Sequence, residues 1–211
     1  MTTQIIAYDN LLTKLRDQVA GRRLMVAIAG PPAAGKSTLA EQLTHDLNAR
    51  SPGLAAAVPM DGFHYDDRIL TARGDLARKG APHTFDVGGL RSILERLRAN
   101  TEDTIAVPLF DRDIEISRNC AMLVAQSVRI ILVEGNYLLL KKQPWASLHG
   151  LFDVTVFASV PEPELLRRLH SRWDRMSAAE LAIKLDGNDL PNARLILDGS
   201  IAADYWIDTS A

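Results

Sequence analysis

The sequence predicts an α/β fold in which helices cover a parallel sheet. Short apolar runs, each long enough for a strand, occur at 24–29, 54–60, 105–109, 128–133, 154–160 and 193–197. Stretches with helical spacing of apolar residues separate most of these runs, as is typical of strand–helix–strand units with parallel strands. The 211 residues, 47% apolar and 24% charged, match one average globular domain, so we expect a single domain over 1–211.

Composition also excludes several functional classes. The 24 basic and 26 acidic side chains nearly balance, so we expect neither a nucleic-acid partner nor a membrane partner. No apolar run approaches the roughly 18 residues of a membrane-spanning helix, and the first residues lack a secretory signal, so a cytoplasmic protein is expected. The single cysteine, Cys120, excludes an internal disulfide and is interpreted as a buried small apolar residue.

The first third of the chain reads as helix, strand, helix. An N-terminal amphipathic helix is expected over 1–21, ending at Gly21. The apolar run 24–29 indicates a strand buried on both faces. A second helix begins at Ser37 and continues to the turn at 51–53. The apolar residues that define the two helices are Ile5, Leu11, Leu12, Leu15 and Val19 in the first, and Leu39, Ala40, Leu43 and Leu47 in the second.

The remainder of the chain alternates similarly, with one polar interruption. A strand at 54–60 leads into the polar segment 61–86, interpreted as a short helix within a mobile segment on the acceptor side. A helix is expected at 87–99, and a strand at 105–109 leads into the charged turn FDRDIEISR. The runs 128–133, 154–160 and 193–197 complete the predicted sheet, and 163–173 has helical spacing.

One motif decides the class of ligand. Residues 30–37, GPPAAGKS, match the phosphate-binding pattern G-x-x-x-x-G-K-[ST] between a predicted strand and a predicted helix. Glycines let the backbone N–H groups face a phosphate, the lysine adds a point charge, and the Ser37 hydroxyl suits Mg²⁺. We therefore expect ATP to bind here. The residues assigned to it are Gly30, Pro31, Ala33, Ala34, Gly35, Lys36, Ser37 and Thr38.

Other motifs narrow the class to a small-molecule kinase. Neither the N-K-x-D motif of GTPase switches nor an LSGGQ-like signature occurs in the sequence. The D-x-x-G match at 86–89 opens a predicted helix and is interpreted as a helix cap. A small-molecule kinase additionally needs a base, a carboxylate for its metal and a lid.

Two carboxylates follow predicted strands at one edge of the sheet, where ligands of α/β sheets bind. Asp61 lies after the second strand, and Glu134 ends the run 130–133. Either can serve as the base. We favour Asp61 as the base, with a share in holding Mg²⁺, and Glu134 as the metal ligand beside Ser37. For Asp61, the alternative is an Asx-turn before Gly62.

The predicted lid region, 162–188, carries a cluster of arginines. They are Arg167, Arg168, Arg172 and Arg175. Arg168 and Arg172 lie four residues apart, so they share a helix face and can converge on one phosphoryl group, which makes them catalytic candidates together with Lys36 and Asp61. A solvated basic face is the alternative interpretation.

Taken together, these segments resemble a known family. The segments GPPAAGKST, MDGFH, FDRDIEISR and VEGNYLL, with RKGAPHTFDV and LDGNDLPNARLI, resemble the phosphoribulokinase/uridine kinase/pantothenate kinase family, and within it the bacterial fructose transport-system kinases. The resemblance implies a P-loop NTPase three-layer sandwich with a five-stranded parallel sheet of order 2-3-1-4-5, and ATP with Mg²⁺ as donor. It also implies that Asn192, with Asn188 and Asp189, lies near the nucleotide base.

The acceptor side departs from the uridine kinase pattern. Where uridine kinases have an aromatic residue and a histidine, this chain has Arg112 and Glu115, which suit a polyhydroxyl or acidic acceptor better than a flat base. For His64 and His83, hydrogen bonding within a local turn is an equal alternative. The candidate acceptor contacts are His64, Arg78, Lys79, His83, Asp111, Arg112, Arg118 and Tyr137.

The sequence therefore predicts an ATP- and Mg²⁺-dependent kinase that phosphorylates a hydroxyl of a small metabolite. A fructose-like sugar is favoured as acceptor, with a nucleoside or pantothenate as alternatives. A nucleotide-binding regulator that accompanies a transporter is the alternative from another class, and a homodimer stays possible.

Overall fold

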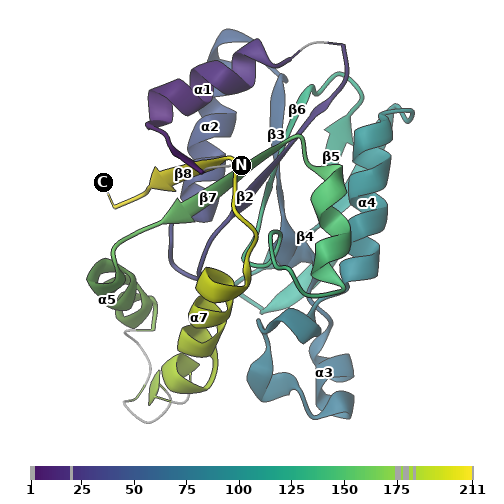
Figure 1. Cartoon of the computed structure of the whole chain (residues 1–211). Helices are drawn as coiled ribbons and strands as arrows, with labels where there is room; N and C mark the ends of the chain where they lie inside the picture. Colours follow the sequence, from purple (N-terminus) through teal and green to yellow (C-terminus); the bar gives the residue numbers. More distant parts are fainter. Residues whose placement is uncertain (1–2, 20, 174–176, 178–180, 183, 211) are drawn as a thin grey trace.

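A six-stranded parallel sheet forms the centre of the computed structural model, which describes all residues except 1–2, 20, 174–176, 178–180, 183 and 211 (Figure 1). The strand order is β1-β8-β7-β2-β6-β3. The bounds are β1 Gln4–Ile5, β2 Leu24–Ala29, β3 Ala55–Pro59, β6 Ile130–Glu134, β7 Val154–Ser159 and β8 Tyr205–Asp208. Within this sheet, β3-β6-β2-β7-β8 reproduces the expected order 2-3-1-4-5, and β1 adds a sixth strand at the edge.

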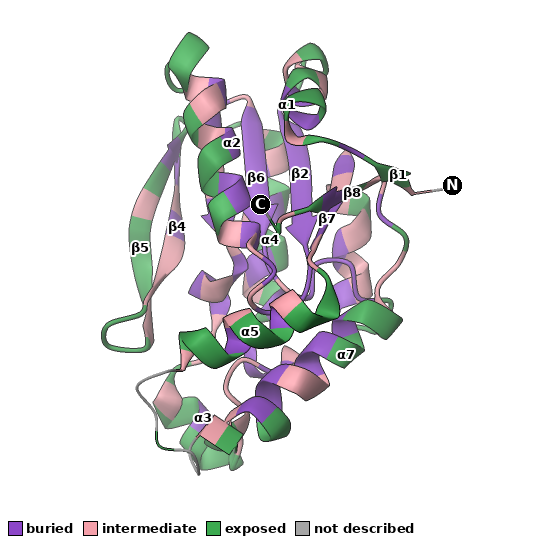
Figure 2. Cartoon of the chain, turned by 90° about the vertical axis from the view of Figure 1, so that its left-hand side faces the viewer, coloured by how far each residue is buried: buried purple, intermediate pink, exposed green. Residues whose placement is uncertain are grey.

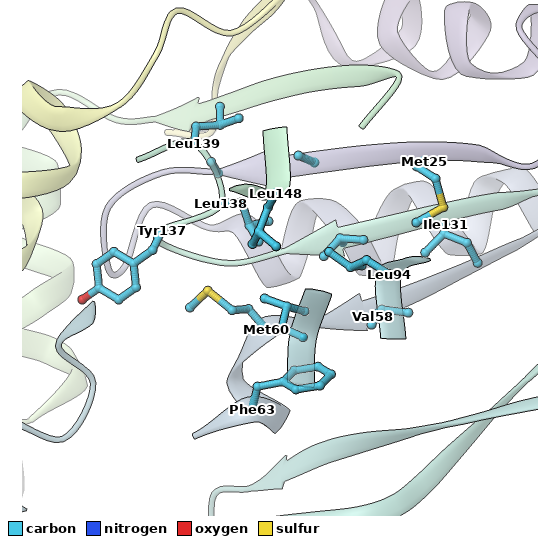
Figure 3. Close-up of a cluster of buried hydrophobic side chains, with 14 of the residues drawn as sticks. Met25, Val58, Met60, Phe63, Leu94, Ile131, Tyr137, Leu138, Leu139 and Leu148 are labelled. Carbon is cyan, nitrogen blue, oxygen red and sulfur yellow. The ribbon is translucent and has the colours of Figure 1, made fainter. Parts of the chain in front are cut away.

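Helices cover both faces of the sheet, which confirms the predicted three-layer α/β class. Strand β2 is buried throughout because Val26 and Ile28 pack on one face and Met25 and Ala27 on the other (Figure 2). Helices α1 (Tyr8–Asp17) and α2 (Lys36–Arg50) cover the first face. Helix α4 (Val87–Ala99), the 3-10 helix Trp145–Leu151 and helix α7 (Leu190–Gly199) contribute to the second core, part of which is drawn in Figure 3.

The N-terminal helix is shorter than expected. It begins at Tyr8 and ends at Asp17, whereas Gln4 and Ile5 form strand β1, which pairs with Tyr205 and Trp206 of β8. Ile5 is 81% exposed, so it takes no part in the apolar helix face to which its spacing assigned it. The sheet edge offers residues 4–5 backbone hydrogen bonds that outweigh their helical spacing.

The segment around 105–125 differs most from the prediction. Strands β4 (Thr104–Asp111) and β5 (Ile116–Ala125) form an antiparallel hairpin outside the main sheet, so the expectation that 105–109 joins that sheet was wrong. The motif FDRDIEISR forms the end of β4, the hairpin turn and the start of β5. Most of β5 is exposed (Figure 2), including Cys120, which contradicts the expected burial of the cysteine.

The run 193–197 is helical rather than extended. It lies in α7, where Ile196 is buried while Leu195 and Leu197 are 40% and 50% exposed. Four apolar residues in five fit a helix turn as well as a strand, and Pro191 at the start of the helix favours the helix. The last strand of the sheet is therefore β8, which the apolar runs did not indicate.

The polar segment 61–86 is built from short helical turns. It comprises the 3-10 helix Met60–Phe63, helix α3 (Asp67–Arg73), and the 3-10 turns Leu76–Arg78 and Pro82–Thr84. Two buried side chains hold it to the core: the Tyr137 hydroxyl donates to the Gly80 oxygen at 2.6 Å, and Trp145 Nε1 donates to the Pro82 oxygen at 3.2 Å. The predicted helix cap at Asp86 is confirmed, since its carboxylate accepts from the Gly89 N–H.

The last structured region before β8 contains helix α5 (Glu162–Arg172), the π-helix Leu185–Asp189 and α7. In Figure 1, α5 and α7 lie below the sheet on one side and α3 lies below it on the other. Among the described residues, no helix is long and apolar enough to cross a membrane.

Candidate active site

The loop between β2 and α2 is curled as its sequence predicts. Ala33 and Gly35 have left-handed backbone angles, with φ of 63° and 75°. A Cβ on Gly30 would collide with the Ala158 carbonyl oxygen of the neighbouring strand, so only glycine fits there. Lys36 Nζ donates to the Pro31 oxygen at 2.8 Å, which closes the loop on itself. The loop therefore precedes the positive end of α2 with its backbone bent as phosphate binding requires.

Two buried charges lie together beside this loop. The Lys36 side chain is buried, and burial lowers its pKa to about 8 against the opposing effect of Glu134 and Asp61. Glu134 ends strand β6 and is 7% exposed, and burial together with the Asp61 charge raises its pKa to about 7. Ser37 Oγ donates to Glu134 Oε1 at 3.2 Å. Because burial penalises the Glu134 carboxylate, a cation bound beside it would be stabilised by the carboxylate charge and would stabilise that charge in turn.

One cavity of about 400 Å³ joins the loop, both carboxylates and the lid side. Its walls come from segments far apart in the sequence. The phosphate-loop wall and the lid contribute Pro32, Ala33, Gly35, Lys36, Ser37, Thr38, Arg168, Arg172, Trp173 and Lys184. The remaining wall comes from Asp61, His64, Lys79, Gly80, Phe85, Phe110, Arg112, Glu115, Glu134, Gly135, Asn136, Asn188, Asp189 and Asn192.

Asp61 is positioned by the turn that follows β3. Its carboxylate lies 3.1 Å from Arg112 Nη2, and its backbone oxygen is 2.8 Å from His64 Nδ1. Because a carbonyl oxygen can only accept, Nδ1 of His64 carries the proton. Burial also lowers the pKa of His64. His64 therefore lines the cavity and also forms the hydrogen bond within the local turn.

Rings that the sequence analysis did not single out line the same part of the cavity. His64 lies 4.0 Å from Phe85 and 4.7 Å from Phe110, measured between ring centroids. Phe85 precedes α4 and Phe110 lies near the end of β4. The aromatic side chains beside His64 are therefore Phe85 and Phe110, and not the residues at positions 112 and 115, where uridine kinases have an aromatic residue and a histidine. Only the hairpin, which brings Phe110 onto His64, reveals this arrangement.

The two lid arginines have different partners. Arg168 is held by Glu164 Oε1 at 2.6 Å and by the Thr209 oxygen at 2.8 Å. The Arg172 guanidinium lies 5.0 Å from the centre of the Trp173 ring and forms no ion pair with any described residue. Arg167 is exposed and pairs with Glu164, whereas Arg175 lies outside the described residues.

Several predicted acceptor contacts lie away from the cavity lining. Tyr137 is buried in the core, where its hydroxyl binds the Gly80 oxygen, and burial raises its pKa. His83 is half exposed and lies 3.4 Å from Asp75. Asp111 and Arg118 pair at 3.0 Å on the hairpin. None of these four residues lines the cavity, although Tyr137 lies near enough to Asp61 for that carboxylate to help raise the Tyr137 pKa.

Of the other predicted residues, Arg78, Gly30, Pro31 and Ala34 do not line the cavity, whereas Asn192 does. Arg78 donates to the Gly187 oxygen of the π-helix and does not line the cavity. Gly30, Pro31 and Ala34 shape the loop without lining the cavity. Asn192 does line it, as the resemblance implied.

Buried polar side chains of the π-helix connect both sides of the cavity. Asn188 Nδ2 donates to the Lys79 oxygen at 2.8 Å and accepts from Asn192 Nδ2 at 3.1 Å through its own Oδ1. Asp189 Oδ2 accepts from Trp173 Nε1 at 2.7 Å. π-turns inside helices frequently mark functional sites, and this one joins the end of the lid helix to the acceptor segment.

Comparisons with known proteins place the whole chain in a family. A putative uridine kinase of Schizosaccharomyces pombe is 30% identical over 95% of this chain and 89% of its own. The Escherichia coli protein YggC is 33% identical over 94% of this chain and 83% of its own length. The chain belongs to the P-loop kinases of the uridine kinase and pantothenate kinase family.

The family includes solved structures. A putative fructose transport system kinase from Silicibacter sp. TM1040 superposes on this P-loop kinase with a TM-score of 0.87, at 37% identity over 95% of this chain and 98% of that one. A pantothenate kinase of Shouchella clausii is 28% identical over 79% of this chain, and the match covers 54% of the length of that pantothenate kinase. No protein-family model matches the chain. The protein is thus an ATP-dependent phosphotransferase that acts on a hydroxyl group.

Proposed function

We propose that this kinase transfers the γ-phosphoryl group of ATP, with Mg²⁺, to a hydroxyl of a fructose-like sugar. The observation that carries the proposal is that Asp61, Lys36 and Glu134 line one cavity beside the phosphate loop. A base, a phosphate-binding cation and a metal carboxylate are the parts that phosphoryl transfer needs, since its catalysis is mainly positioning and charge stabilisation.

Asp61 is assigned as the general base. Its carboxylate faces the cavity, and the hydrogen bond from Arg112 holds one of its oxygens at 3.1 Å. The other Asp61 oxygen can accept the proton of the acceptor hydroxyl. The hydroxyl oxygen of the acceptor then attacks the γ-phosphorus of ATP, and the bond between the γ-phosphorus and the β-phosphate oxygen breaks.

Lys36 and Arg172 are assigned to the phosphoryl charge. Lys36 Nζ already donates to the loop itself, so the ammonium is fixed where the β- and γ-phosphates would lie. Arg172 lines the cavity without a carboxylate partner among the described residues, so its guanidinium is available to an anion. Arg168 is held between Glu164 and Thr209 and, in this proposal, positions the lid side.

The oxygen donors beside the loop fit Mg²⁺. The described residues contain no group of three or more His, Cys, Asp or Glu side chains able to hold a metal. A site with Ser37 Oγ, Glu134 and a share from Asp61 suits Mg²⁺, which binds through few carboxylates and completes its shell with water and phosphate oxygens. The ion would neutralise negative charge on the β- and γ-phosphates.

A sugar is proposed as acceptor because charged hydrogen-bonding groups stand beside rings. Arg112 and Glu115 can bind hydroxyl groups, and His64 and Phe110 offer apolar faces on which the C–H face of a sugar ring can pack. A nucleoside is the second candidate, favoured by the same rings and by the relative named as a uridine kinase.

A coupled assay tests the proposal directly. ADP release would be measured with ATP and Mg²⁺ in the presence of ketoses, aldoses, nucleosides and pantothenate in turn. Release that depends on a sugar supports the proposal, and release that depends on a nucleoside supports the second candidate. Slow hydrolysis indifferent to every added compound would refute both.

A further inference from the structure

Both cations in the acceptor half of the cavity already have carboxylate partners. The acceptor half is defined here as Asp61, His64, Lys79, Gly80, Phe85, Phe110, Arg112 and Glu115. Lys79 Nζ lies 2.5 Å from Asp67 Oδ1 at the start of α3 and also donates to the Glu115 backbone oxygen. Arg112 pairs with Asp61. An anionic acceptor would therefore compete with Asp67 for Lys79 and with Asp61 for Arg112.

One carboxylate of the acceptor half has no such partner. The Glu115 side chain lines the cavity and forms no ion pair with any residue that the structure describes. Its backbone is left-handed, with φ of 55°, a conformation that is costly for a non-glycine residue and is enriched at functional sites. Its carboxylate can accept hydrogen bonds from hydroxyl groups, and it repels an anion.

The cations without carboxylate partners lie on the other side. Arg172 and Lys184 stand 5.0 Å and 5.1 Å from the centre of the Trp173 ring, and neither forms an ion pair with a described residue. Lys36 donates only to a backbone oxygen. The cavity is therefore electrostatically divided. Among the described residues, cations without a carboxylate partner lie on the phosphate-loop and lid side, and a carboxylate without a cation partner, Glu115, lies on the acceptor side.

We propose that the acceptor is an uncharged hydroxyl compound, and that the Asp67–Lys79 pair excludes acceptors bearing a carboxylate or phosphate. The inference rests on the proposed function and narrows its acceptor class. An anionic group entering the acceptor half must compete with Asp67 for Lys79 or with Asp61 for Arg112, and it also meets the Glu115 carboxylate; each of these opposes binding. Selectivity then comes from a repulsive arrangement as well as from contacts with the neutral acceptor.

Matched pairs of compounds test the charge preference. In each pair, one CH₂OH group of the neutral compound is a carboxylate in the anion, and the other hydroxyl groups are shared: panthenol and pantothenate, glycerol and D-glycerate, glucitol and gluconate. ADP release would be measured for each compound at constant ionic strength. We expect kcat/KM for the neutral member to exceed that for the anion by at least about tenfold. An anion used as well as its neutral partner would overturn the inference.

Asp67→Asn tests the residue pair. The substitution leaves Lys79 without its carboxylate, so the ratio of neutral to anionic kcat/KM should narrow by about tenfold through a gain for the anion. Asp75→Asn is the matched control, because Asp75 lies on the same segment and pairs with His83 outside the cavity. An unchanged ratio in Asp67→Asn, or an equal change in Asp75→Asn, would overturn the role of the pair.

A binding measurement separates this inference from the proposed function. The same pairs would be titrated calorimetrically into each protein with Mg²⁺ and a non-hydrolysable ATP analogue. Preferential binding of the neutral members without ADP release would refute the proposed function and support the charge preference. Preferential binding of the anions, or no binding by any member, would count against the charge preference.

Discussion

The two halves of the cavity are built in different ways. The phosphate-loop wall comes from residues within one short stretch, 30–38, that joins strand β2 to helix α2, and its lysine donates to a carbonyl oxygen five residues away. The acceptor half draws on the turn after β3, the segment before α4 and the β4–β5 hairpin. Its contacts join residues far apart in sequence, such as Arg112 with Asp61 and Tyr137 with Gly80.

This difference indicates that the specificity for the acceptor depends on the acceptor half of the cavity. A local loop is reproduced whenever the same short sequence follows a strand and precedes a helix. A wall assembled from distant segments changes when any of them shifts, so acceptor choice can vary while nucleotide binding stays the same. Substitutions in the two halves should therefore affect different kinetic parameters.

The largest expected effect comes from Asp61→Asn. The amide cannot accept the proton of the acceptor hydroxyl, so kcat should fall by about a thousandfold or more. Binding of a fluorescent ATP analogue should persist, because the phosphate loop is intact. Asp111→Asn is the matched control, since that carboxylate pairs with Arg118 outside the cavity. Near-normal turnover in Asp61→Asn would remove Asp61 from the mechanism.

Lys36→Met should act on the nucleotide half alone. Loss of the fixed ammonium should lower kcat by about a hundredfold and weaken the binding of ATP. Lys79→Met provides the comparison in the acceptor half, where we expect a higher KM for the acceptor and an unchanged KM for ATP. Initial rates with each substrate varied in turn measure both. If the two variants altered the same parameter, the division into halves would be wrong.

Glu134→Gln should stabilise the ligand-free protein. The pKa of Glu134 rises from 4.5 to about 7 on folding, so between these values the folded chain holds a proton that the unfolded chain has released, and stability falls as pH rises through this window. The amide removes this loss but also removes the Glu134 charge that favours the Lys36 ammonium, so we expect a net gain of about 1 kcal/mol above pH 7. Urea unfolding from pH 5 to 8 measures the gain. A variant less stable than the parent at pH 8 would contradict it.

The smallest effect is expected from Tyr137→Phe. Removing the hydroxyl frees the Gly80 oxygen and loosens the acceptor segment, so KM for the acceptor should rise by about threefold to tenfold while KM for ATP stays constant. Tyr8→Phe is the matched control, because it removes a comparable hydroxyl, bonded to Asp46 on α2, away from the cavity. Equal effects of the two variants would show that Tyr137 acts only through general stability.

The sequence predicted the parts of the fold that depend on local pattern. Strand β2 and helix α4 have the predicted bounds, because a continuous apolar run and a capped amphipathic face each determine one structure. The assignment of 193–197 to a strand and the expected burial of Cys120 were wrong, because short apolar runs and single residues fit more than one environment. The aromatic wall at Phe85 and Phe110 left no periodic signal.

The parallel sheet and the curled phosphate loop at 30–37 follow from local sequence, since glycine geometry and the spacing of apolar residues act over a few neighbouring residues. Which side chains face Asp61, and which cations already have carboxylate partners, became apparent only from the folded structure. Those pairings join the β4–β5 hairpin, the segment before α4 and the π-helix, and their geometry depends on packing between segments that local patterns do not encode.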